Sequence, residues 1–262
     1  MDLGISGRVA IVAAGSKGLG RAVAQELAAN GAAVTICARG PEAIDATCEE
    51  IRAAGGRAHG VAADVSLTAD IARVVDETRR TFGDVDILVT NSGGPKPGPF
   101  DSLTPEDWDA ATRVLLSSAV AFTRAVLPGM RARRWGRIVN ITSIAAKQPV
   151  DGLMLSNSLR AAVTAFGRTL ANEVAADGVT VNNLMPGYTR TDRVIELSEH
   201  RARTEGTTTD EIYGRWESEI PMRRLGEPRE FAAMAAFLAS ERASYVTGQT
   251  IAVDGGWIKA LL

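Results

Sequence analysis

The chain has 262 residues, of which 45% are hydrophobic and 23% charged, so it is long and apolar enough to bury the core of one large α/β domain. Its 29 lysines and arginines against 31 aspartates and glutamates give a net charge of −2, which excludes a general attraction to nucleic acid or to an anionic membrane. Two cysteines and two histidines, without metal-ligand spacing, argue against a metal site and suit a reducing cytoplasm.

Short apolar runs alternate with longer amphipathic segments along the whole chain. Runs that are apolar at nearly every position indicate strands buried on both faces, as in a parallel sheet covered by helices. The pattern predicts an α/β fold in a single domain over residues 1–262, a doubly wound parallel sheet with helices on both faces. We expect strands at residues 8–14, 33–38, 57–63, 86–90, 136–142, 179–185 and 249–253.

The first predicted strand leads into a glycine-rich loop that is followed at once by a helix. Glycines in such a loop let the backbone turn tightly and approach a pyrophosphate, while the helix N-terminus offers free N–H groups and the positive end of its dipole. The spacing GxxxGxG therefore predicts a dinucleotide site. The residues expected to form it are Gly15, Ser16, Lys17, Gly18, Leu19 and Gly20.

The end of the second predicted strand indicates which dinucleotide is bound. NAD-binding proteins usually place an acidic residue there to hold the adenosine ribose, whereas this chain has Arg39, with Lys17 as a second cation in the loop. Two cations suit the 2′-phosphate of NADP. NADP(H) is therefore favoured, and NAD(H) remains possible because either side chain could be an ordinary solvated charge.

One long polar segment interrupts the alternation near the C-terminal third of the chain. Residues 189–224 lie between the sixth predicted strand and the next helix. Insertions of this length usually serve as lids or binding loops, so we expect a lid here.

Several motifs together resemble the short-chain dehydrogenase/reductase family, and within it the 3-oxoacyl-[acyl-carrier-protein] reductase-like branch. They are the glycine loop, Asp64 after the third strand, TNSGG at 90–94, MPGYTRT at 185–191 and the closing segment 224–256. The resemblance covers essentially the whole chain. It implies a Rossmann fold and an NADP-linked oxidoreductase.

The same resemblance implies further cofactor contacts. Asp64 and Val65 correspond to residues beside the adenine, and Asn91, Ser92 and Gly93 to the segment that shapes the cofactor cleft. In the family, the segment corresponding to Pro186, Gly187 and Thr191 flanks the nicotinamide, with the threonine bonded to its carboxamide.

The family's catalytic positions are altered in this chain. The resemblance implies a serine that binds the substrate oxygen, a tyrosine that passes a proton, a lysine that lowers the pKa of the tyrosine and an asparagine that helps to place the lysine. Ser143 keeps the first position, but Ser156, Arg160 and Leu115 occupy the others. An alkyl hydroxyl is too weak an acid to replace a phenol, and arginine does not give up a proton, although it can still hold ribose hydroxyls.

Two other residues could supply the missing proton. Lys147 follows Ser143 by four residues and should enter the substrate side of the cleft, where partial burial would lower its pKa. Tyr188 brings a phenol to the loop beside the nicotinamide. A solvated lysine and a packing tyrosine are the ordinary alternatives. For Ser156, the alternative is a small polar residue that satisfies free N–H groups near a helix start.

Two functions follow from this sequence. The favoured one is an NADP-dependent oxidoreductase that moves a hydride between the nicotinamide and a small carbonyl or secondary alcohol substrate, with Ser143 polarising the substrate oxygen. The alternative is a catalytically impaired dinucleotide-binding sensor or scaffold.

The resemblance also implies a homotetramer or homodimer, and the basic run 130–137 could receive an acyl carrier protein, although such a run is more typical of a solvated helix end. The N-terminal apolar run is too short for a signal peptide, and no other run approaches the ~20 residues of a membrane span, so we expect a cytoplasmic protein with no nucleic-acid or membrane partner.

Overall fold

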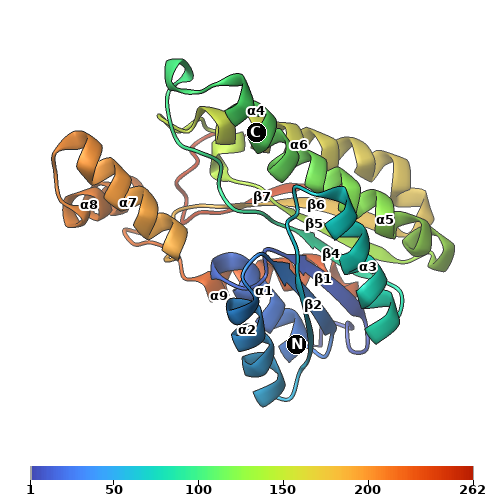
Figure 1. The fold of residues 1–262 in the computed structure, drawn as a ribbon. Helices are drawn as coiled ribbons and strands as arrows, with labels where there is room; N and C mark the ends of the chain where they lie inside the picture. The colour runs from blue at the N-terminus through green and yellow to red at the C-terminus, as the bar shows by residue number, and fades with distance from the viewer. Residues whose placement is uncertain (1, 262) are drawn as a thin grey trace.

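The computed structural model describes residues 2–261 and contains a seven-stranded parallel sheet in the order β3-β2-β1-β4-β5-β6-β7 (Figure 1). The doubly wound α/β prediction is confirmed, and each predicted strand agrees with the observed one to within one residue at either end. The strands are β1 Val9–Ala13, β2 Ala33–Ala38, β3 Arg57–Ala62, β4 Ile87–Thr90, β5 Gly136–Ile141, β6 Val179–Pro186 and β7 Thr250–Val253.

Helices cover both faces of the sheet, and each face has its own apolar core. One core joins the sheet to α1 Gly18–Ala29, α2 Pro41–Ala53 and α9 Pro228–Leu238. The other joins it to α3 Thr68–Phe82, α5 Ser118–Arg133 and α6 Met154–Val174. Burial on both faces explains why β1, β2 and β4 are apolar at nearly every position.

A long helical stretch runs through α4 Pro105–Thr112, a π-helical turn (η2) at Arg113–Ser117 and α5. By length and composition alone, the stretch Pro105–Arg133 could cross a membrane. It packs on the sheet instead, with Phe122, Val126 and Met130 in the second core. Leu115, at the family's asparagine position, is buried in the π-helical turn in a cluster with Leu155 and Leu159 of α6.

The strand order reverses between β1 and β4, so the loops that follow these neighbouring strands leave the sheet in opposite directions. In open α/β sheets this switch point forms a crevice at the carboxyl ends of the strands, where ligands bind. The fold therefore brings the glycine loop after β1 next to the TNSGG segment after β4.

The polar segment 189–224 folds into two helices, α7 Asp192–Glu205 and α8 Thr209–Glu219. They stand out from the body of the molecule on one side of the carboxyl edge of the sheet (Figure 1). Val194, Ala202, Ile212, Trp216 and Leu225 form a small apolar cluster of their own there. This helical pair owes its stability to that local core, because isolated helices of this length are marginal in water.

An ion pair joins the residues that follow α8 to the first turn of α9. Glu230 accepts bonds from Arg224 at 2.8 and 2.6 Å and from the Glu227 backbone N–H at 2.8 Å. The Arg224 guanidinium is the main cause that lowers the pKa of Glu230 from 4.5 to about 2.

We expect the contribution of Glu230 to stability to depend on pH. Because its pKa is depressed in the folded state, that contribution is present above about pH 4.5 and is lost as the pH falls toward 2. Urea unfolding of the wild type and Glu230→Gln at a series of pH values should show a stability difference that is constant above pH 5 and shrinks below pH 4. A difference that does not vary with pH would contradict this role.

Candidate active site

A cavity of about 520 Å³ opens at the carboxyl edge of the sheet. That volume is within the range of small-molecule sites. Its walls come from the loops after β1, β4 and β5, from the start of α6, and from the segment that leads from β6 into α7. The predicted site residues on these walls are Lys17, Gly18, Leu19, Arg39, Asn91, Ser92, Gly93, Ser143, Ser156, Arg160, Pro186, Gly187, Tyr188 and Thr191.

The glycine loop has the geometry of a phosphate cradle. Helix α1 begins at Gly18, whose φ is +52°, with no side-chain cap and no acidic residue in its first turn, so its leading N–H groups are open to an anion. A Cβ at Gly20 would lie 2.2 Å from the Ala14 carbonyl oxygen, and one at Gly15 would lie 2.8 Å from Ile36. The loop therefore needs glycine at both positions, and it fits a pyrophosphate.

The cations predicted to select the dinucleotide reach the same cavity. Lys17 and Arg39 are both exposed and both line it. Asp64 and Val65 are not among the lining residues. The Asp64 carboxylate accepts the Ser66 backbone N–H at 2.9 Å, and this bond is the main cause that lowers the pKa of Asp64. In the structure, Asp64 therefore holds the turn after β3.

Ser143 lies just beyond β5 and caps a short helical turn (η3) at Ile144–Ala146. Its Oγ accepts the Ala145 backbone N–H at 3.1 Å, which fixes the oxygen and leaves the hydroxyl proton available to a ligand. Ser156, on the first turns of α6, lines the same cavity. The fold thus brings both serine hydroxyls to one cavity although 13 residues separate them.

Arg160 is partly buried on α6, and its Nη1 donates to the Ile141 carbonyl at 2.8 Å. This is its one side-chain hydrogen bond to residues 2–261, so its other N–H groups are open to a ligand. Burial lowers the pKa of Arg160 to about 10, and repulsion from Arg193 adds to the shift. The guanidinium is therefore a desolvated cation that an anion would stabilise.

The sequence did not single out Arg193, which lies on the first turn of α7 and lines the cavity. Its Nη2 donates to the Pro95 carbonyl at 3.1 Å, so it joins the segment 189–224 to the loop after β4. A Cβ at Gly94 would lie 2.7 Å from this guanidinium, so a side chain there would displace Arg193 from its present position. Only the tertiary fold brings Arg193 to the same cavity as Arg160, and no local pattern indicates it.

The structure does not bring Lys147 to this cavity, contrary to the expectation that it enters the substrate side. Lys147 is exposed and ends the turn η3, where its backbone N–H bonds the Ile144 carbonyl at 3.0 Å. It is not among the residues that line the cavity. The position of Lys147 fits the solvated alternative.

Tyr188 lines the cavity, but its ring is held in an aromatic cluster. It stacks on Trp216 with ring centroids 4.6 Å apart and meets Trp257 edge-on at 6.0 Å. Burial, the largest cause, raises the pKa of Tyr188. These contacts fit the packing alternative, because a raised pKa makes the phenol a weaker proton donor at neutral pH.

Neither Ser156, for which capping was the ordinary alternative, nor the polar residues that follow it cap helix α6. Helix α6 begins at Met154, before them, and has no side-chain cap at Leu153. The Asn157 side chain instead bonds the backbone of Val150, donating to the carbonyl at 3.0 Å and accepting the N–H at 3.2 Å. This pair of bonds fixes the loop that forms part of the cavity wall, because Val150 lines it.

Two further regions bear on the predicted partners. Within residues 2–261, no group of three or more His, Cys, Asp or Glu side chains could hold a metal ion. In the basic run 130–137, Arg131 pairs with Asp177 at 2.8 Å and Arg133 with Asp84 at 2.8 Å. These pairs support the interpretation of this run as a helix end.

Comparison with known proteins agrees with this geometry. Residues 13–258 match the family described as enoyl-(acyl carrier protein) reductase. The chain is 34% identical over 257 residues to 3-oxoacyl-[acyl-carrier-protein] reductase FabG of Aquifex aeolicus, covering 98% of this chain and 99% of the relative.

Two solved structures are also similar. L-sorbose reductase from Gluconobacter frateurii, complexed with NADPH and L-sorbose, has a TM-score of 0.94 at 35% identity and covers 100% of both chains. An actinorhodin polyketide ketoreductase variant with NADPH has a TM-score of 0.93 at 34% identity, covering 97% of this chain and 98% of that one. With its glycine loop, its switch-point cavity and these relatives, the chain belongs to the short-chain dehydrogenase/reductase family.

Proposed function

We propose that this protein is an NADP(H)-dependent oxidoreductase that transfers a hydride between the cofactor and a small carbonyl compound or the corresponding secondary alcohol. The observation that carries the proposal is the single cavity that joins the glycine loop, the two cations Lys17 and Arg39, and the hydroxyl of Ser143. The NADPH complexes among the similar structures support the choice of cofactor.

Each group in this cavity has a proposed role. The open N–H groups of α1 hold the pyrophosphate, Lys17 and Arg39 hold the 2′-phosphate, and Arg160 holds the nicotinamide ribose. Bound NADPH supplies the hydride. Ser143 donates a hydrogen bond to the substrate oxygen, where charge develops during the transfer.

The source of the proton differs from the family pattern. The Ser156 hydroxyl is too weak an acid, Lys147 lies outside the cavity, and burial raises the pKa of Tyr188. We propose that water within the cavity supplies the proton, with Ser143 and Ser156 as hydrogen-bonding groups.

Helices α7 and α8 serve as a lid, a role supported by the bond between Arg193 and the loop after β4.

The proposal is tested by two measurements on the purified protein. Titration with NADPH, followed by nucleotide fluorescence, should give saturable binding. Incubation with NADPH and a panel of ketones, aldehydes and enones, followed by absorbance, should give oxidation of the nucleotide. Binding without turnover on any member of the panel would favour the sensor or scaffold function.

The cofactor preference can be tested at one residue. Arg39→Asp should weaken NADPH binding about 10–100-fold, because it removes a charge-assisted hydrogen bond of roughly 1.5–3 kcal/mol and adds repulsion. NADH binding to the same variant should be unchanged or stronger, which provides the internal control for folding. Equal losses for both nucleotides would contradict a role at the 2′-phosphate.

We also propose a cytoplasmic homotetramer or homodimer. This proposal rests on the family resemblance and on the apolar character of α5 and α6 on more than one face. Light scattering at micromolar concentration tests it, and a monomer would overturn it. Acyl carrier protein is a weaker proposal for a partner, because the basic run is engaged in ion pairs within the chain.

A further inference from the structure

The cations on the cavity wall form two groups that come from different parts of the sheet. Lys17 and Arg39 follow β1 and β2, beside the glycine loop, and we have assigned them to the 2′-phosphate of the cofactor. The second group lies at the loops after β4 and β5. Its members are Lys96 in the loop after β4, Arg160, which bonds the last residue of β5, and Arg193, which bonds the loop after β4.

Arg160 is the buried member of the second group, and it lacks a counter-charge. Its Nη1 donates to the Ile141 carbonyl at 2.8 Å, and it forms no ion pair with a carboxylate of residues 2–261. A buried charge is costly unless a partner of opposite sign balances it. The nicotinamide ribose, which we assign to Arg160, is uncharged, so bound cofactor leaves this cation without an anion.

Arg193 is only weakly paired. Its Nη1 lies 3.5 Å from the Glu196 carboxylate, and the Glu196 side chain is 65% exposed, so solvent screens this ion pair. Its Nη2 bonds the Pro95 carbonyl at 3.1 Å, which is a neutral acceptor. Lys96 is better matched, because its ammonium lies 2.7 Å from Asp107. Arg193 therefore keeps the capacity to bind an anion.

The acidic residues of the wall do not cancel these charges. Within residues 2–261 they are Asp192 and Glu196, both exposed. Asp192 lies at the glycine-loop end, where it also lines a neighbouring hollow of about 480 Å³ with Lys17 and Arg21. Glu196 is thus the single carboxylate beside the second group of cations, so this end of the cavity has a positive balance.

The wall around this positive end is largely apolar. An apolar body fits such a wall, whereas a polyhydroxylated one would lose its hydrogen bonds to water there. The apolar residues contributed by the loop after β5, the approach to α6 and the segment 188–197 are Ile144, Val150, Leu153, Tyr188, Val194 and Leu197.

We infer that the substrate carries a carboxylate and an apolar body in addition to its reacting group, and that Arg193 binds this carboxylate while Arg160 supplies a second positive charge in the same cavity. The inference rests on the proposed NADP(H)-linked hydride transfer and names the substrate class, an apolar oxo acid or the corresponding hydroxy acid. Arginine suits this role because its planar guanidinium matches both oxygens of a carboxylate.

The substrate test compares oxo acids with their methyl esters on the wild-type protein. 2-Oxohexanoate, 3-oxohexanoate and 4-oxohexanoate differ from their esters in charge and keep the ketone and the chain. Followed by NADPH absorbance, at least one acid should have a kcat/KM about 10–100-fold above that of its own ester, the size of a charge-assisted hydrogen bond. A kcat/KM at least as high for every ester as for its acid would overturn the inference and leave the proposed oxidoreductase intact.

Arg193→Gln tests the residue itself through the ratio of kcat/KM for acid and ester. The variant should reduce this ratio about 10–100-fold. The ratio cancels both the intrinsic reactivity of each ketone and the loss of the bond to Pro95, because these affect the wild type and the variant, or the acid and the ester, alike. An unchanged ratio with weaker NADPH binding would place Arg193 at the cofactor and overturn the inference.

Arg203→Gln is the matched control for charge. Arg203 lies on the same helix, its side chain is 70% exposed, and it does not line the cavity. It should leave the ratio of acid to ester unchanged. An equal fall in the ratio for the two variants would show a general effect of positive charge on α7 and would contradict binding by Arg193.

Glu196→Gln tests the same site by a gain of activity. Removing the competing carboxylate should raise kcat/KM for the acid about 2–5-fold, the size of a screened ion pair, and leave that for the ester unchanged. Glu199→Gln is its control, since Glu199 pairs with Arg203 on the same helix and lies outside the cavity. An unchanged or lower kcat/KM for the acid in Glu196→Gln would contradict the inference.

A binding measurement tests the carboxylate site without turnover. Hexanoate should bind the protein with NADP⁺ about tenfold or more tightly than hexanamide, measured by titration calorimetry, and Arg193→Gln should remove the difference. Equal binding of the two compounds would overturn the inference, whatever the turnover results are. Preferential binding of hexanoate without reduction of any of the six ketones would support the carboxylate site and count against the proposed hydride transfer alone.

Discussion

Ser143→Ala should lower kcat about 10²–10³-fold while leaving the dissociation constant of NADPH within about twofold of the wild type. The magnitude is that of removing one hydrogen-bond donor from an oxyanion site. The hydroxyl is fixed by the bond from the Ala145 N–H at 3.1 Å, so alanine removes a preorganised donor and not a mobile one. Steady-state kinetics with the best acceptor of the panel, together with nucleotide fluorescence titration, measure both quantities.

The control for this variant is Ser158→Ala, since Ser158 is exposed on α6 and is not among the residues lining the cavity. It should leave kcat and KM unchanged. If Ser143→Ala raised KM alone, the hydroxyl would bind ground state and transition state equally, and the proposed role in the reaction would be wrong. If both serine variants behaved like the wild type, another group would have to hold the oxygen.

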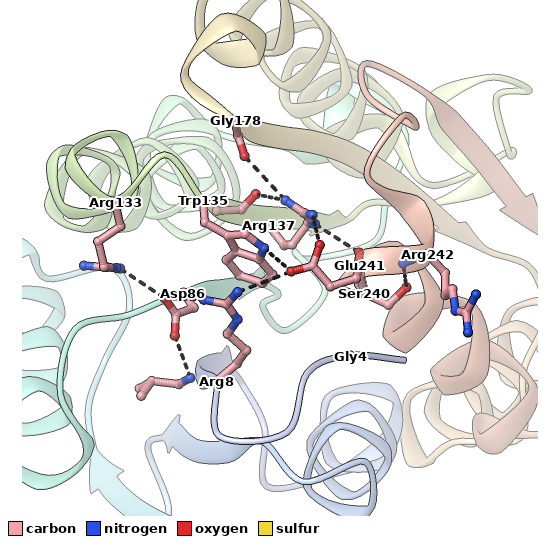
Figure 2. A network of polar contacts seen from close by, with 12 residues as sticks. Gly4, Arg8, Asp86, Arg133, Trp135, Arg137, Gly178, Ser240, Glu241 and Arg242 are labelled. Atoms are coloured by element: carbon pink, nitrogen blue, oxygen red, sulfur yellow. Dashed lines mark hydrogen bonds and ion pairs between the residues drawn. The ribbon is translucent and has the colours of Figure 1, made fainter. Parts of the chain in front are cut away.

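Glu241→Ala should lower the free energy of unfolding by about 2 kcal/mol, because it leaves the buried Arg137 guanidinium without a counter-charge. Arg137 is 2% exposed, and burial, the largest cause, already lowers its pKa. Glu241 accepts bonds from Arg137 at 3.5 Å, Trp135 at 2.6 Å and Arg8 at 3.3 Å (Figure 2). We expect the melting temperature to fall by about 5 °C, measured by calorimetry.

The surroundings of Glu241 explain why one exposed carboxylate has this effect. The Trp135 ring is contacted by two guanidinium groups, with the Arg8 carbon 3.7 Å and the Arg137 carbon 4.4 Å from its centre. The Glu241 backbone N–H also bonds the Leu3 carbonyl at 3.0 Å, which ties the N-terminal segment to this network. The carboxylate therefore balances two cations and holds the indole that both of them contact.

Glu50→Ala is the matched control, because the Glu50 side chain has the same 45% exposure as that of Glu241 and accepts bonds from an arginine and one other side chain, Arg21 and Gln25. Its arginine partner is 42% exposed, whereas Arg137 is buried, so we expect a loss below about 1 kcal/mol. Equal losses in the two variants would show that burial of the partner is not what makes Glu241 important.

The sheet and the phosphate loop could be predicted because their signals are local. A strand buried on both faces needs an apolar residue at nearly every position, and β1 and β2 meet that requirement in the sequence itself. The loop needs glycine because a Cβ at Gly20 would lie 2.2 Å from a carbonyl oxygen. These constraints act within a few residues of the chain, so the sequence carries them directly.

The direction of individual side chains was harder to predict. Lys147 follows Ser143 by four residues, yet the turn η3 leaves it exposed outside the cavity. Tyr188 was expected beside the nicotinamide and lines the cavity, but its ring stacks on Trp216 of α8, a residue 28 positions further along the chain. A side chain points where its packing partners allow, and those partners come from distant segments.

The sequence by itself determined the parallel α/β fold, the dinucleotide loop and the substitution of Ser156 and Arg160 for a tyrosine and a lysine, because spacing and residue type decide these. Only the tertiary structure decided that Arg193 and Arg160 line one cavity, since α7 begins at the wall of that cavity. Charges far apart in the chain act on each other through space, so their combined effect on an oxyanion depends on the folded arrangement.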